Sequence, residues 1–315
     1  MLHLRVIAPA DLREPILRVL REQPGVAHIV LLAGAAVDPA GDQITADVAR
    51  EAADEIVQRL KSLDVQHFGA ITLEPLDTVL SSAAYHAEDV AGGDGADAVI
   101  WDELVSRTRE ESSLSVTFLM FLCIACLLAA IGVVTDSAIT VVGAMVVGPE
   151  FGPLAALAVA LVQRRVSLAR RAGAALLVGF PVAMVVTGLA TLGFEALGWV
   201  QLTTFSELTQ VDFIFQVGPF SFVVALLAGA AGMLSLVSSK SAALVGVFIS
   251  VTTVPAAGFA VVAATVGDWD VAADSVLQLL VNLLGITMAG VLTLAVYRRA
   301  KVGSRTKVRR AVTSG

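Results

Sequence analysis

One acidic residue lies in the middle of a long apolar stretch. Glu150 stands in GAMVVGPEFGP, residues 143–153, next to Pro149 and between Gly148 and Gly152. A charged carboxylate at the centre of a membrane helix costs at least about 2–3 kcal/mol on insertion scales. We therefore expect this carboxyl group to be protonated, paired or exposed to a water-filled cavity. The pattern indicates either proton or cation coupling, or a neutral carboxyl group that satisfies the backbone of a broken helix.

A second group of polar residues lies further along the chain. Thr252 and Thr253 precede Pro255 in another apolar stretch, and Asn282 stands in LVNLLGI. Proline removes a backbone donor, and the carbonyl groups it frees must be buried in protein or face water. We expect the polar groups of the two stretches to face each other. The predicted substrate or ion site comprises Gly148, Pro149, Glu150, Gly152, Thr252, Thr253, Pro255 and Asn282.

Other residues with reactive side chains give weaker patterns. Cys123 and Cys126 form a CxxC inside an apolar stretch, where a thiolate is costly, so we interpret them as packing residues. His3, His28 and His67 are interpreted as polar residues on a sheet face. The alternative is a ligand or metal site, since His3 and His67 could be neighbours if the first and last strands pair. The chain has no HExxH motif, phosphate loop or visible nucleophile–base pair. We expect neither an enzyme nor a cofactor or metal site.

Composition places the chain among multi-pass membrane proteins. It is 57% hydrophobic and 16% charged over 315 residues. Residues 1–113 hold 20 acidic and 9 basic residues, whereas residues 114–315 hold 8 and 12. The acidic front part is unsuited to nucleic acid. It also lacks the basic start and apolar core of a signal peptide, so we expect it to remain in the cytosol.

The front part predicts a small α+β domain over residues 1–76. Period-two and helical patterns alternate in the order βαββαβ, the ferredoxin-like plan. Residues 77–113 form an acidic linker, whose last part contains Val99, Ile100, Trp101 and Leu104. That part is either an interfacial helix anchored by Trp101 or an ordinary linker helix that packs on the front domain.

Six apolar stretches over residues 114–297 are long enough to cross a membrane. The predicted spans are 114–134, 138–162, 172–194, 219–237, 241–266 and 275–297. With the N-terminus inside, all twelve Lys and Arg residues after residue 113 fall on the cytoplasmic side, including the basic tail 298–315. This distribution follows the positive-inside rule and predicts a plasma (inner) membrane protein with both termini in the cytoplasm.

The second and fifth spans resemble each other. SAITVVGAMVVGPEFGPLAAL at 137–157 and SAALVGVFISVTTVPAAGFAVV at 241–262 both have a Ser-Ala start and a central proline. Three spans per unit would place the two units in opposite senses, giving two inverted three-helix repeats with broken second and fifth helices. The alternative is a pair of kinks that help helices to pack, with Gly148 and Gly152 on a close-contact face.

Three stretches resemble the domain of unknown function 389 family of membrane proteins. They are residues 136–161, 244–262 and 279–292. Members typically have an apolar residue where Glu150 stands here and a double proline where this chain has Val254-Pro255. The resemblance implies a membrane protein and often a similar front domain, and it implies no activity.

Two functions fit these patterns. The first is a secondary transporter or channel-like protein for a small solute or ion, with a midplane site between the broken helices and regulation by the front domain. The second is a membrane-anchored sensor or scaffold whose spans serve assembly and whose front domain binds a ligand or partner. Faces of small residues are compatible with a homo-oligomer.

Overall fold

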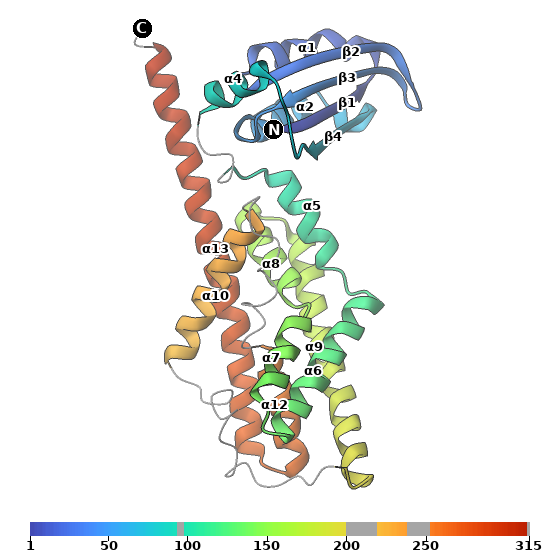
Figure 1. The fold of residues 1–315 in the computed structure, drawn as a ribbon, viewed down its shortest axis with the longest axis vertical. Coiled ribbons are helices and arrows are strands. Elements are labelled where there is room, and N and C mark those ends of the chain that lie inside the picture. The colour runs from blue at the N-terminus through green and yellow to red at the C-terminus, as the bar shows by residue number, and fades with distance from the viewer. Residues whose placement is uncertain (93–97, 200–218, 238–252, 314–315) are drawn as a thin grey trace. The chain divides into compact units, whose positions relative to one another are not determined.

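The computed structural model describes residues 1–92, 98–199, 219–237 and 253–313, with side chains left out for residue 219 and residues 300–313 (Figure 1). It divides into two compact units, Met1–Glu103 and Leu104–Gly315. Each unit has its own core, and each is described separately below.

The first unit contains a four-stranded antiparallel sheet in the order β2-β3-β1-β4. Its strands are β1 Leu2–Ala8, β2 Val26–Val37, β3 Ala40–Val48 and β4 Ala70–Pro75. Its helices are η1 Ala10–Leu12, α1 Arg13–Glu22, α2 Arg50–Ser62, α3 Val65–Phe68 and α4 Ser82–Ala91. The predicted succession βαββαβ is therefore observed, with two short additional turns, η1 and α3.

The alternating pattern of β1 determines which face of the sheet is covered. Leu2, Leu4 and Val6 are buried, whereas the intervening His3 and Arg5 lie on the other face. Residues of α1 and α2 pack against the buried face, so both helices cover the same side of the sheet (Figure 1). A strand that alternates in this way must have one face against a core.

Residues before α5 pack on this first unit. Ile100 is buried in its core, and the backbone N–H of Trp101 donates a hydrogen bond to Asp54 at 3.2 Å. Lys61 and Asp102 form an ion pair at 2.9 Å. These contacts join the residues at the start of α5 to the first unit, and an interfacial helix stays a prediction.

The second unit is helical. Its elements are α5 Trp101–Glu111, α6 Val116–Val134, α7 Ala138–Val147, α8 Phe151–Gln163, α9 Val166–Ala196, α10 Pro219–Val237, α12 Val254–Val266 and α13 Trp269–Thr313. Four of these helices, α6, α9, α10 and α13, are long and apolar enough to cross a membrane. The bent pair α7 and α8 gives a fifth candidate span. The second unit is thus that of a multi-pass membrane protein.

The helices agree with five of the six predicted spans, with longer bounds for α9 and α13. For the remaining predicted span, 241–266, residues 241–252 lie outside the described residues, and the rest is the 13-residue helix α12. The six-span count and the inverted repeat therefore stay predictions.

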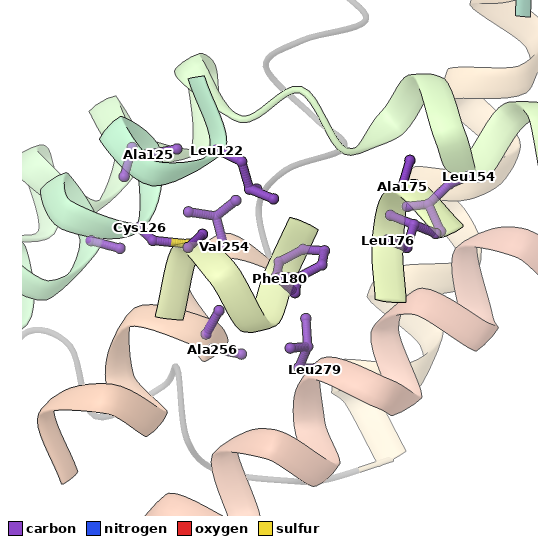
Figure 2. Packing of buried hydrophobic residues seen from close by; sticks show 14 of the residues in the cluster. Leu122, Ala125, Cys126, Leu154, Ala175, Leu176, Phe180, Val254, Ala256 and Leu279 are labelled. Atoms are coloured by element: carbon purple, nitrogen blue, oxygen red, sulfur yellow. The ribbon is translucent and has the colours of Figure 1, made fainter. Parts of the chain in front are cut away.

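The core of the second unit forms where α6, α9, α12 and α13 meet. Leu122 and Cys126 of α6, Phe180 of α9, Val254 of α12 and Leu279 of α13 belong to one buried cluster (Figure 2). Cys126 is fully buried and both cysteines are free thiols, as expected of packing residues. This cluster fixes the start of α12 against α6.

Candidate functional site

The chain breaks between α7 and α8, where the two helices meet at an angle of 51°. α7 ends at Val147, and Gly148 follows in an extended conformation with φ −61° and ψ 127°. Pro149 has no N–H to donate to the carbonyl group four residues earlier, and Pro153 repeats this loss in the first turn of α8. The two prolines explain why an apolar stretch long enough for one span folds as two helices.

Glu150 lies at this break and is fully buried. The hydroxyl group Oγ1 of Thr253 donates a hydrogen bond to Glu150 Oε1 at 2.5 Å. The second carboxyl oxygen, Oε2, is also buried and has no hydrogen-bond partner among the described residues. One oxygen of the Glu150 carboxyl group is therefore hydrogen-bonded, and the other is buried without a partner in the part of the chain that the structure describes.

Thr253 occupies the position before the first residue of α12. Its carbonyl oxygen accepts the backbone N–H of Ala257 at 3.1 Å, and its side chain is fully buried. Pro255 stands in the first turn of α12, where a missing N–H costs no helical hydrogen bond. The backbone of Thr253 thus starts the helix while its hydroxyl group remains available to Glu150.

Gly148 makes room for this contact. A Cβ atom placed on it would collide with Glu150 Oε2 and would lie 3.0 Å from Val254 Cγ2. Any larger residue at this position would have to displace the carboxyl group or the start of α12. Gly148 therefore belongs to the site by leaving space, and Pro149 belongs to it by breaking the helix.

Gly152 faces a different neighbour. It is buried, and a Cβ atom added there would lie 2.8 Å from both the Cβ atom and the backbone oxygen of Glu111. This residue lets α8 approach the end of α5. A close approach of this kind is what the alternative of a close-contact glycine predicts.

Asn282 is fully buried in α13. Gln278, one turn earlier, donates a hydrogen bond from Nε2 to Asn282 Oδ1 at 3.2 Å. Their neighbours on α13, Leu279 and Leu283, pack in the same core as Val254. Thr252, the last of the predicted site residues, lies outside the described residues.

Two buried polar residues near this core were not predicted. Gln278 Oε1 and Thr187 Oγ1 have no hydrogen-bond partner within the part of the chain that the structure describes. Gln278 and Asn282 are four residues apart in an apolar stretch, which places them on one face of a helix. That spacing was available in the sequence and would have identified Gln278.

A separate polar network lies in the first unit. His3 Nδ1 is 2.8 Å from Asp47 Oδ1, and His28 Nδ1 is 2.7 Å from Asp47 Oδ2. β1 and β4 do pair, but His67 lies exposed in α3, before β4 begins. The pairing places His3 opposite Glu74 and not beside His67, because His67 precedes the strand.

The network continues to a hydroxyl group. His28 Nε2 is 2.8 Å from Ser81 Oγ, so Asp47, His28 and Ser81 follow one another as an acid, a base and a hydroxyl group do in a hydrolase. No nucleophile–base pair was visible in the sequence, because the members of this series are 19 and 53 residues apart in the chain. Ser81 Oγ also accepts the N–H of Ala84 as the N-cap of α4.

No group of three or more His, Cys, Asp and Glu residues suited to a metal ion is found among the described residues. In the first unit, His3 and His28 both direct Nδ1 toward the same carboxylate. His3 lies in β1, His28 in β2 and Asp47 in β3, and Ser81 is the N-cap of α4, so the network joins three strands to the start of this helix.

Acid should weaken this network. Burial raises the pKa of Asp47, but hydrogen bonds and charge interactions with His3 and His28 outweigh it and hold the pKa below the usual value. The resulting stability is complete above the ordinary aspartate pKa of about 3.9 and is lost as the pH falls through the lower value of the folded state. Hydrogen exchange in the full-length protein should show β3 amides losing protection in this range.

The matched control for this prediction is Asp47→Asn, which removes the titrating group. The variant should exchange β3 amides faster than the wild type at neutral pH and show a smaller additional loss in acid. Equal acid sensitivity of the two proteins would contradict the assignment to Asp47.

Comparison with known protein families gives a match that lies within the second unit. The model of the family described as Domain of unknown function (DUF389) matches residues 145–288. This part of the chain is similar to the DUF389 family. The matched segment begins at the end of α7 and contains Glu150, Thr253 and Asn282, so the predicted resemblance is confirmed. The family description gives no activity, and no curated protein and no solved structure matched the chain.

Proposed function

We propose that this protein is a secondary transporter or channel-like protein for a small solute or ion, with Glu150 and Thr253 at the centre of its site. The observation that carries the proposal is the fully buried Glu150 carboxyl group at a helix break, bonded at Oε1 and without a partner at Oε2 among the described residues. A proton or a small cation is the ligand that such a group accepts.

The cost of burial supports a functional role for the carboxyl group. A buried polar oxygen without a partner costs about 1–3 kcal/mol, and a buried charge costs more. An apolar residue of similar volume would avoid this cost. A proton on Oε2, or a cation shared with backbone carbonyl groups of the break, satisfies the oxygen and leaves again when the site opens to water.

The position of the site supports transport across the membrane. Pro149 interrupts one apolar stretch and Pro255 stands at the start of α12. We propose that these are the two breaks of an inverted repeat of six spans, which would place the site near the bilayer midplane. The distribution of basic residues supports cytoplasmic termini in the plasma membrane, and faces of small residues support a homo-oligomer.

We propose that the protein is not an enzyme and that the Asp47–His28–Ser81 series has a structural role. The Ser81 oxygen is engaged as the N-cap of α4. Substituting an N-cap serine typically costs about 1 kcal/mol, so the series stabilises the start of this helix.

Ion flux into proteoliposomes tests the proposed function. Vesicles containing a trapped pH-sensitive dye would be given a proton gradient, with and without K⁺ or Na⁺ on one side. Protein-dependent flux above that of empty vesicles is the expected result. Folded protein that carries neither protons nor these cations would favour a sensor or scaffold, with its front domain as the binding part.

A further inference from the structure

A cavity of about 400 Å³ lies in the second unit, between α5 and the connection from α8 to α9. Three arginines and one serine contribute its polar groups. The lining residues are Val105, Arg109, Arg165, Ser167, Leu168 and Arg171. The basic stretch QRRVSLARR, residues 163–171, contains four of the twelve basic residues that oriented the predicted spans, and it also provides four of the lining residues of this cavity.

The turn between α8 and α9 places these residues. Arg164 adopts a left-handed conformation with φ 56°, and the N–H of Arg165 bonds to the carbonyl oxygen of Ala160 at 2.9 Å. Arg165 stands immediately before α9, and Arg171 follows about one and a half to two turns later. α5 brings Arg109 to the same cavity.

The first turn of α9 adds backbone donors. Its first N–H groups have no partner within the helix, and the helix dipole makes this end positive. Arg165 provides no side-chain cap, and the first turn has no acidic residue. Ser167 and Leu168, which belong to this turn, line the cavity. An anion in the cavity would meet both these donors and the guanidinium groups.

Among the described residues, Arg109 and Arg171 are not paired with carboxylates, and no Asp or Glu lines the cavity. Arg107, by contrast, pairs with Glu111 at 3.5 Å. Arg298 donates a hydrogen bond to the Val162 carbonyl oxygen at 3.0 Å, which brings a further cation to this end of the unit. The cavity is therefore a concentration of positive charge.

We propose that this cavity binds a phosphoryl group, carried by an anionic lipid or present as free phosphate. Planar guanidinium groups match the geometry of phosphate oxygens and bind them in pairs. Helix N-termini supply the same recognition through backbone N–H groups. The volume lies within the range of small-molecule sites, and basic pockets beside membrane helices are suited to lipid headgroups. This site is separate from Glu150 and does not depend on the proposed transport function.

Binding measurements on the full-length protein in a neutral detergent test the proposal. The probes are inorganic phosphate, a soluble short-chain phosphatidylglycerol and the corresponding phosphatidylcholine. The variants are Arg109→Gln and Arg171→Gln. Arg170→Gln is the matched control, because Arg170 is exposed like its chain neighbour Arg171 but does not line the cavity.

The expected result is binding of an anionic probe that falls at least about tenfold in each cavity variant, or 1.4 kcal/mol, and is unchanged in the control. Binding of phosphatidylglycerol alone would identify a lipid headgroup, and binding of inorganic phosphate as well would identify the phosphoryl group as sufficient. Unliganded thermal unfolding monitors the fold of each variant. Failure of both anionic probes to bind, or an equal loss in Arg170→Gln, would overturn the proposal.

Discussion

Replacing Glu150 with glutamine is expected to lower proton or cation flux at least about tenfold, equivalent to 1.4 kcal/mol in the barrier. Glutamine has nearly the same shape, and its amide oxygen can still accept the hydrogen bond from Thr253 Oγ1 that the structure shows at 2.5 Å. It can neither release a proton nor balance the charge of a cation. Flux into proteoliposomes, at matched protein content, measures the effect.

The fold of this variant should remain intact. Because glutamine removes the need to bury an ionisable group, we expect Glu150→Gln to unfold at the same temperature as the wild type or higher. Glu150→Asp is the companion variant, since it keeps the charge but shortens the side chain. Full flux through a folded Glu150→Gln protein would contradict a coupling role for this carboxyl group.

Replacing Thr253 with valine is expected to destabilise the second unit by about 1–3 kcal/mol, the usual cost of a buried polar group that loses its partner. Valine preserves the shape but removes the hydroxyl group that donates a hydrogen bond to Glu150 Oε1. Unfolding of the purified protein by a denaturing detergent measures the loss.

Two further variants separate the hydroxyl group from the packing around it. Thr253→Ser keeps the donor and should retain most of the stability. In the double variant Glu150→Leu with Thr253→Val, no unpaired carboxyl group remains, so the combined loss should be smaller than the sum of the single losses. Additive losses would mean that the contact between Glu150 and Thr253 contributes nothing to stability.

Much of the fold follows from local patterns in the sequence. Leu2, Leu4 and Val6 alternate with polar residues, and a period of two fixes the buried face of β1 whatever lies around it. Apolar length likewise identifies α6, α9, α10 and α13. In both cases, the signal is contained in one short stretch, so no knowledge of distant contacts is needed.

The candidate site was partly predictable for the same reason. An acidic residue beside a proline in an apolar stretch is unusual enough to identify Glu150, and a second proline identified the stretch that contains Thr253. The hydrogen bond between them shows that these two polar groups face each other, as expected. The spacing could not show that Gly148 faces Glu150 while Gly152 faces Glu111, because that depends on the bend of the helix pair.

Contacts between distant segments were not predictable. Ser81 reaches His28 only because α4 packs on the sheet, and the sequence between them contains no sign of this. Arg109 reaches the cavity beside Arg171 only through the packing of α5. From charge alone, the basic stretch at residues 163–171 could be used only to orient the predicted membrane spans. Its place in the lining of a cavity became visible only in the three-dimensional structure.

Access of water to Glu150 tests the central claim most directly. In a background with Cys123 and Cys126 replaced by alanine, single cysteines would be placed at Val147, Phe151 and Val254, which are the chain neighbours of Gly148, Glu150 and Thr253 and leave those three residues in place. Each variant would be treated with a membrane-impermeant maleimide from each side of the membrane. Val141, which is buried in α7 away from the break, provides the matched control position. We predict labelling at the three positions beside the site from at least one side, slowed by the transported ion, and none at residue 141. Silence at all four positions in folded protein would contradict an ion site and leave the break as a packed kink.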